Sequence, residues 1–181
     1  GYYNAGSLTQ GYNNTILGAA SASSLTTGYN NTVIGYSANV SSVTANNEIT
    51  LGNGQIQTLR CNDATIAELS DSRDKTNVID SPYGLDFINS LRPVQFTWQR
   101  RVLLPSDENH PFNGKTRLGF LAQELQSAMP NNENDTLDLV YESNTDRLEA
   151  KYGKLVPILE QAIKYLKAQY DALAARVTAL E

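Results

Sequence analysis

The sequence predicts a mixed fold, with a repetitive β segment over residues 1–69 and an α+β domain over residues 70–181 that ends in a long coiled-coil helix. Three observations predict this fold. A glycine recurs at a fixed interval in the first third, helical and strand patterns alternate in the middle, and an apolar heptad runs to the end. The length of 181 residues suits one domain plus an extension.

The first third of the chain repeats every seventeen residues, with glycines at Gly1, Gly18, Gly35 and Gly52. A fixed period of this kind indicates a stacked architecture. Asn-Asn pairs and glycines supply the turns, because both residue types tolerate left-handed backbone. Each unit contains one short apolar strand, expected at residues 15–17, 32–34 and 49–51.

This β stack is too thin to be stable alone. Each rung offers two or three apolar side chains, too few to offset the entropy of ordering seventeen residues. Stacked repeats bury their faces against neighbours, so we expect a homo-oligomeric fibre of stacked or intertwined chains, most simply a trimer. Residues 9–52 resemble the head repeats of trimeric bacterial adhesins and phage tail fibres. The alternative is a fragment of a monomeric β-solenoid.

The β segment is also nearly uncharged. Residues 1–69 contain four charged side chains, at Glu48, Arg60, Asp63 and Glu68. Little therefore prevents the strands from associating edge to edge. Because non-local strand pairing nucleates late, assembly of this segment should benefit from a device that first brings the chains together.

Composition excludes several classes of function. The net charge of −5 argues against a non-specific nucleic-acid binder, and no apolar run is long enough to span a membrane. One cysteine, Cys61, and one histidine, His110, cannot supply the usual zinc ligands. We therefore expect no metal, no cofactor, no nucleic acid and no membrane as partners. Cys61 is expected to be a small buried residue, His110 to lie in a loop, and Gly1 to mark a cut from a longer chain.

The middle of the chain alternates between helical and strand patterns. Apolar residues at helical spacing precede Arg92-Pro93, which should end that helix. The pattern predicts helices at 85–91 and 123–129, strands at 55–59 and 94–98, a strand or strand-to-helix turn at 118–122, a hairpin of 137–141 with 148–150, and loops at 99–116 and 131–136. Residues 62–69 are ambiguous between strand and helix.

The last segment, about residues 153–181, carries an apolar residue in alternating steps of three and four. Pro157 lies near the start of this expected helix, where its missing amide costs little. The stripe favours pairing with copies of the same helix; the alternative is a helix lying on its own domain. The stripe consists of Val156, Leu159, Ile163, Leu166, Tyr170, Leu173, Val177 and Leu180.

The junction between the two regions, residues 70–75, carries the candidate chemistry. Ser70 precedes Lys75 by five positions, and a neutral lysine amine can take the proton of a serine hydroxyl. Burial or nearby cations would have to lower the pKa of that lysine. The alternative is structural, because Ser and Asp at these positions are also typical caps of a turn or helix start.

Residues 70–181 contain four motifs that are specific in combination. They are Ser70-Asp71-x-Arg73-x-Lys75; Gly84-Leu85-x-x-Ile88-x-x-Leu91-x-Pro93-x-x-Phe96-x-Trp98; Gly119-Phe120-Leu121-Ala122-Gln123-Glu124-Leu125 followed by Pro130; and Tyr152-x-x-Leu155-x-Pro157-x-Leu159-x-x-Ala162-Ile163-x-x-Leu166. Together they resemble the C-terminal autocleaving intramolecular chaperone domain of phage tailspikes and tail fibres, the endosialidase type. The same module is found in a membrane-tethered animal transcription factor.

The resemblance implies a single-turnover serine endopeptidase that cuts its own chain between Leu69 and Ser70. Ser70 is then the nucleophile, Lys75 the general base, and the assembly a trimer. Asp71 and Arg73 are candidate supporting residues; Arg73 either lowers the lysine pKa or makes only a surface salt bridge.

Gln123 and Glu124 lie in a matched motif and are further candidates to support the site. The alternative for them is a satisfied structural pair near a helix start.

The implied partners are copies of the same chain and the upstream fibre segment as folding client. The implied setting is a virion tail fibre assembled in the bacterial cytoplasm, from which the chaperone fragment is released. The sequence leaves a host receptor of the parent fibre open. Two alternative functions remain at this stage: a permanent receptor-binding fibre tip without cleavage, and a switch that releases a DNA-binding partner.

Overall fold

The computed structural model describes residues 2–101, 109–130 and 134–180. The chain divides into two compact units, each of which takes residues from both sides of position 70. The first unit comprises residues 1–64, 95–117 and 143–146, and the second comprises residues 65–94, 118–142 and 147–181. The domain boundary expected after residue 69 stays a prediction.

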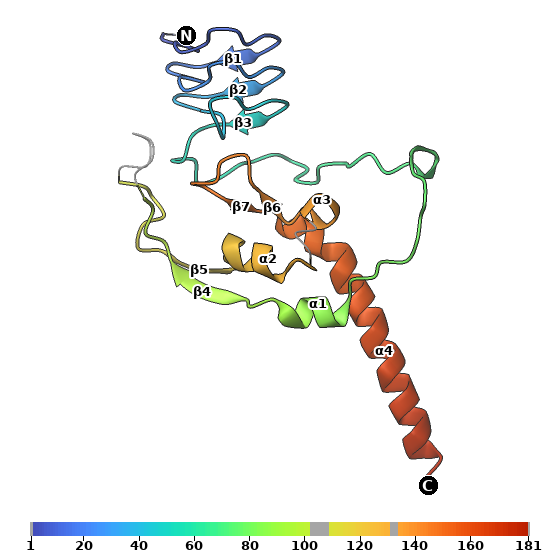
Figure 1. The fold of residues 1–181 in the computed structure, drawn as a ribbon. Coiled ribbons are helices and arrows are strands. Elements are labelled where there is room, and N and C mark those ends of the chain that lie inside the picture. Colours follow the sequence, from blue (N-terminus) through green and yellow to red (C-terminus); the bar gives the residue numbers. More distant parts are fainter. Residues whose placement is uncertain (1, 102–108, 131–133, 181) are drawn as a thin grey trace. The chain divides into compact units, whose positions relative to one another are not determined.

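A three-stranded parallel sheet forms the start of the first unit (Figure 1). Its strands are β1 (Thr15–Leu17), β2 (Thr32–Ile34) and β3 (Ile49–Leu51), paired in the order β1-β2-β3. Thr15 lies opposite Thr32, and Thr32 lies opposite Ile49, so that each rung repeats the previous one after seventeen residues. The ladder continues beyond the strands, because Gly35 N donates to Leu17 O at 2.8 Å.

Small apolar side chains and an asparagine fill the interior of this stack. Asn31 is buried, and its Nδ2 donates to Asn14 Oδ1 at 3.0 Å and to Ala45 O at 2.7 Å. Tyr12 and Tyr29 stack with ring centroids 5.0 Å apart, which places equivalent tyrosines of successive rungs in contact. The buried apolar residues are Ala22, Leu25, Val33, Ala38, Val40 and Ala45.

The second unit has its own core, formed where two helices meet the start of a third. α1 (Leu85–Ser90) and α2 (Ala122–Ala128) pack with the first turns of α4 (Val156–Thr178), which follows the short helix η4 (Tyr152–Leu155). α3 (Asn134–Leu137) closes the same cluster. The buried members are Phe87, Leu125, Met129, Leu137, Leu139, Val140, Leu155 and Ile158.

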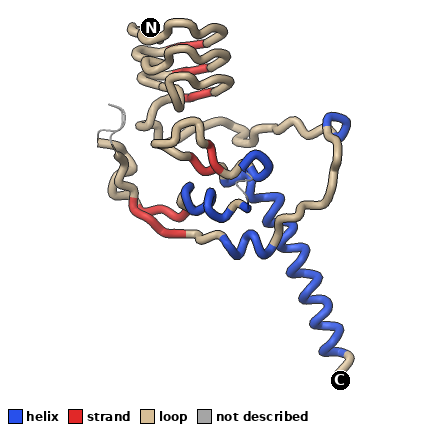
Figure 2. The backbone as a smooth tube through the Cα atoms, viewed as in Figure 1, coloured by secondary structure: helices blue, strands red, loops and turns tan. Residues whose placement is uncertain are grey.

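Two small sheets complete the described elements (Figure 2). β4 (Val94–Thr97) pairs with β5 (Thr116–Gly119). β6 (Val140–Tyr141) and β7 (Glu149–Ala150) form an antiparallel pair in which Val140 lies opposite Ala150. The mixed fold with a long C-terminal helix is therefore confirmed, and Pro157 lies at the start of α4, where the sequence placed it.

Some expected elements differ from the structure. The strand expected at residues 55–59 is wrong: the chain turns here, with Ile56 N donating to Asn53 O at 3.1 Å, and forms no strand. The expected strand at 137–141 shrinks to Val140–Tyr141, because Leu137 ends α3 instead.

The asparagine that begins α3 explains the shortened strand. Asn134 Nδ2 donates to Val140 O at 2.9 Å, and Val140 N donates back to Asn134 Oδ1 at 3.2 Å. This pair of local hydrogen bonds holds α3 against the start of β6 and overrides the strand pattern.

Other expectations concern loops and single residues. Part of the expected loop at 131–136, and part of that at 99–116, lies outside the described residues. Residues 62–69 form neither strand nor helix. Cys61 is exposed rather than buried, which corrects the sequence expectation, and His110 lies in a loop as expected but is buried. Within the described part of the chain, no helix is both long and apolar enough to cross a membrane.

Candidate active site

The approach to the candidate site is an exposed segment without regular secondary structure. Every residue from Thr65 to Ser81 is exposed, and the Leu69 residue is fully exposed at 101%. Nothing in the described chain therefore covers the Leu69–Ser70 peptide bond from solvent.

A single 3₁₀ turn, η1 (Ser72–Asp74), brings the two candidate catalytic residues together. Asp71 caps this turn by accepting a hydrogen bond from Arg73 N at 2.9 Å, and Lys75 N donates to Ser72 O at 3.2 Å. The chain bends so that Lys75 Nζ donates to Ser70 Oγ at 2.6 Å. The predicted nucleophile and base are thus in direct contact.

Arg73 forms a surface ion pair with Asp71 rather than approaching Lys75. Arg73 Nη2 lies 2.6 Å from Asp71 Oδ2. The side-chain hydrogen bond from Arg73 holds the pKa of Asp71 below its usual value, and the same bond raises the pKa of Arg73. Because both side chains are exposed, the pair adds little to stability, and its main effect is to fix the shape of the turn.

One chain provides the contact that serine–lysine chemistry needs, but not the environment. A lysine accepts a proton only when its amine is neutral, which requires burial or neighbouring positive charge. Ser70 and Lys75 are both exposed in the single chain. The structure therefore brings the two groups together without the desolvation that this chemistry needs.

Gln123 and Glu124 lie on the first turn of α2, and their described contacts do not reach Ser70 or Lys75. Glu124 forms an ion pair with Arg92, and Ser127 Oγ donates to Gln123 O at 2.9 Å. The ion pair of Glu124 is a structural role near a helix start, and the contact of Gln123 uses only its backbone carbonyl. Support of the site by these two residues stays a prediction.

A lysine that the sequence did not single out lies near the scissile bond. Lys154 Nζ, in η4, is 3.7 Å from a carboxylate oxygen of Glu68 and 3.6 Å from Asp138 Oδ2. Asp138 also pairs with Lys151, and the hydrogen bond from Lys151 holds the pKa of Asp138 below its usual value. The contact links the residue before Leu69 to the base of α4. Only the path of the chain reveals it, because Glu68 and Lys154 are far apart in sequence.

Residues 70–132, roughly a third of the chain, match the family described as chaperone of endosialidase. The match starts at Ser70, the first residue of the predicted catalytic turn. The match supports an endosialidase-type intramolecular chaperone domain in this segment. The chain matches none of the curated proteins with which it was compared.

The chaperone family implies an interaction with an upstream fibre client. The family name suggests a peptidase-like activity. The match does not identify a cleavage site or catalytic residues. No group of three or more His, Cys, Asp or Glu side chains in the described ranges is arranged to hold a metal ion.

Proposed function

We propose that this chain is a self-cleaving assembly chaperone. Three copies associate through α4, the upstream β stack folds with its strands in register, and the Leu69–Ser70 bond then breaks. The observation that carries the proposal is the 2.6 Å contact between Lys75 Nζ and Ser70 Oγ, beside a fully exposed Leu69.

The cleavage step uses groups that the chain already contains. The Ser70 oxygen attacks the Leu69 carbonyl carbon while the Lys75 amine takes the hydroxyl proton. The C–N bond breaks, the proton passes from Lys75 to the Ser70 nitrogen, and an ester now joins Leu69 to the Ser70 oxygen. Water hydrolyses this ester to a Leu69 carboxylate and a free Ser70 hydroxyl. Because the attack is intramolecular, positioning supplies much of the rate.

Assembly supplies what the single chain lacks. The exposed dyad has no desolvated surroundings, and a covering subunit would lower the fraction of Lys75 that is charged. Cleavage then waits until the chains have assembled, which protects the client from early loss of its chaperone.

The two faces of α4 support self-association. Ile158 and Ala162 are buried against the domain of their own chain, whereas the heptad stripe points elsewhere and is largely exposed. Ile163 is 64% exposed and Leu166 is 51% exposed. An apolar heptad seam of this length is stabilised by pairing with identical helices, and tethering three chains raises the effective concentration of their β segments.

The outer side of the β stack supports a shared fibre. Leu17 and Ile49 are 63% and 72% exposed in the single chain, although their type favours burial. Copies of the stack would cover these side chains. After cleavage removes the chaperone domain, the fibre must still cross a high activation barrier to unfold. An unfolded fibre could no longer refold with the help of that domain, so the folded fibre is kinetically trapped.

The proposed setting is the tail fibre or tailspike of a phage, assembled in the host bacterium. The mature fibre keeps the β segment and serves host attachment, and the chaperone fragment leaves after cleavage. The family of the matched segment and the fibre-like repeats are the two observations that favour this setting.

A denaturing gel of freshly made protein tests cleavage. Wild-type chain should give two fragments, one with Ser70 as its first residue, whereas Ser70→Ala should give one band. Lys75→Arg keeps the charge but removes the base, and should slow cleavage at least ~100-fold. Ser72→Ala, in the same turn, is the matched control and should cleave normally.

The second candidate function is a permanent fibre tip in which residues 70–75 are only a capped turn. The Asp71 cap and its ion pair with Arg73 favour this alternative. One stable full-length band from assembled wild-type protein would establish it. Cleavage of Lys75→Ala at the normal rate would instead keep autoproteolysis and reject Lys75 as the base.

A further inference from the structure

The third rung of the β stack departs from the two rungs before it. At four positions the first two rungs carry the same residue and the third carries a different, hydrogen-bonding one. These positions are Ala5, Ala22 and Asn39; Leu8, Leu25 and Ser42; Tyr12, Tyr29 and Asn46; and Asn14, Asn31 and Glu48.

The substitutions turn the end of the stack into a polar surface. Leu25 is fully buried, whereas the equivalent Ser42 adds a hydroxyl at the side of the third rung. The asparagine ladder ends at Glu48, whose N donates to Asn31 Oδ1 at 3.0 Å. The Glu48 carboxylate accepts from Ser41 N at 3.0 Å and from Ser41 Oγ at 2.6 Å. Glu48 therefore fixes the conformation of Ser41.

A segment from the C-terminal part of the chain contacts this surface within the first unit. Asn144 Nδ2 donates to Ser41 O at 2.9 Å. The hydroxyl oxygen of Ser143 lies 3.0 Å from that of Ser41 and 3.4 Å from that of Ser42. These residues belong to the turn between β6 and β7.

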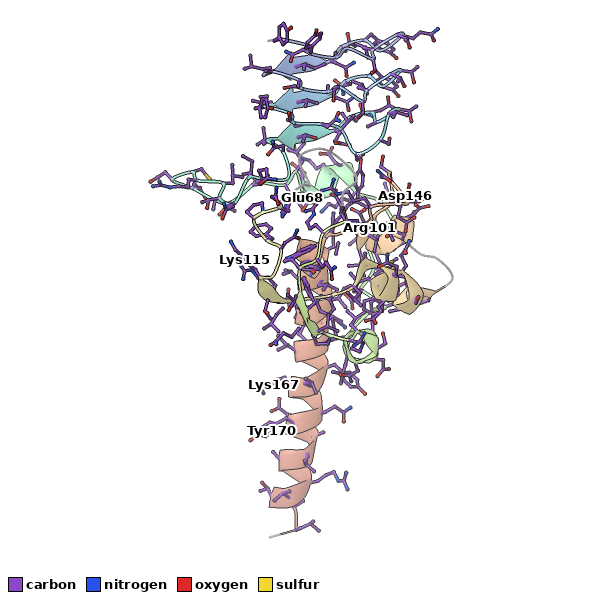
Figure 3. All side chains as sticks on the ribbon, turned by 90° about the vertical axis from the view of Figure 1, so that its left-hand side faces the viewer. Glu68, Arg101, Lys115, Asp146, Lys167 and Tyr170 are labelled. Atoms are coloured by element: carbon purple, nitrogen blue, oxygen red, sulfur yellow. The ribbon has the colours of Figure 1, made fainter. Side chains whose placement is uncertain are left out.

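The turn is preorganised for this contact. Asn144 Oδ1 accepts from Asp146 N at 3.0 Å, and this bond within the turn sets the orientation of the Asn144 amide. Arg101 donates to Asp146 O from another segment of the same unit (Figure 3). Hydrogen bonds from within the turn and from Arg101 therefore fix the conformation of residues 143–146 independently of their contact with the third rung.

We propose that the β6–β7 turn, residues 143–146, is a docking element that recognises the last rung of the client. The earlier rungs carry Leu8 and Leu25 where the turn meets Ser42, and a leucine cannot hydrogen-bond to Ser143. The turn thus fits one end of the stack and fixes the register from which the remaining rungs are laid down. The inference rests on the proposed chaperone function but not on cleavage.

Disulfide trapping tests the contact directly. In a Ser70→Ala, Cys61→Ser full-length background, Ser42→Cys combined with Ser143→Cys should form an intrachain disulfide on mild oxidation. The matched control combines Ser42→Cys with Thr145→Cys, because Thr145 lies in the same turn. Failure to cross-link above this control, or cross-links only between chains, would overturn the assignment.

Replacing the amide nitrogen of Asn144 by an oxygen tests whether its hydrogen bond to Ser41 holds the turn on the third rung. Asn144→Asp keeps the shape and the bond from Asp146 N, but places an oxygen against the Ser41 carbonyl. We expect amide hydrogens of residues 41–48 to exchange at least about tenfold faster, with Thr145→Ala unchanged. Equal exchange in Asn144→Asp and wild type would overturn the proposal. Because Ser70→Ala blocks cleavage throughout, a failed dyad and a failed docking element give separate results.

Discussion

At the residue scale, the candidate dyad is a product of local sequence. A cap at Asp71 and one 3₁₀ turn suffice to bring Lys75 to Ser70, so the contact needs no distant element. That is why the sequence could predict the pair. The solvent exposure of Ser70 and Lys75 could not be predicted from local sequence, because burial depends on which residues distant in the chain, or in another chain, pack against the turn.

Asp138 gives a pH-dependent prediction at the same scale. Lys151, with Lys154, lowers the pKa of Asp138 in the folded state. The Asp138 carboxylate therefore stabilises the folded chain at any pH above the pKa of Asp138 in the unfolded state. This stabilisation is lost as the pH falls through the pKa of Asp138 in the folded state. Asp138→Asn should therefore lower the melting temperature of the full chain at neutral pH, and this effect should shrink as the pH falls below 3.8, the usual pKa of Asp. Thermal unfolding followed by circular dichroism across this pH range measures the difference.

The control for Asp138 is a double-mutant cycle with Lys151. Lys151→Met should remove most of the same increment at neutral pH, and the double variant should lose little more than either single variant. Additive losses would show that Asp138 owes its effect to another partner.

At the scale of the element, the rungs stack closely because glycine lies where two turns of the chain meet. A Cβ on Gly28 would collide with the carbonyl oxygen of Ala45 in the next rung, whereas a Cβ on Gly6 would meet nothing within 4 Å. Gly28→Ala should therefore destabilise the β segment by about 1–3 kcal/mol, the usual range for overpacking.

Gly6→Ala is the matched control for this prediction, since it makes the same chemical change in an earlier turn. Chemical denaturation of the uncleaved Ser70→Ala chain, followed by hydrogen exchange in residues 9–52, measures both variants. Equal stability of the two would mean that the rungs do not approach as closely as the structure shows.

At the scale of the whole molecule, α4 makes two separate contributions. One face packs on α1 through Ile158 and Ala162, and the other presents the heptad stripe. Leu166→Asp should abolish self-association, and with it cleavage, while the domain of each chain stays folded. Sedimentation measures the association, and the denaturing gel measures the cleavage.

Ala168→Asp supplies the comparison for Leu166→Asp, because it introduces the same charge on the same helix away from the stripe. It should leave both association and cleavage intact. Cleavage at a normal rate in a monomeric Leu166→Asp chain would show that the dyad works without a partner.

The sequence by itself determined what depends on neighbours in the chain. The seventeen-residue period marks the strands β1 to β3, the apolar spacing marks α1, α2 and α4, and five residues of a capped turn pair Ser70 with Lys75. Such features follow from local backbone geometry and periodic burial.

Only the tertiary structure decided which distant residues meet. It placed Lys154 beside Glu68 and set Asn144 against the last rung at Ser41. These contacts depend on the path of the chain between the partners, and each is a polar pair with no periodic pattern to mark it in the sequence. For the same reason the strand expected at residues 55–59 failed, because a strand needs a partner as well as a pattern.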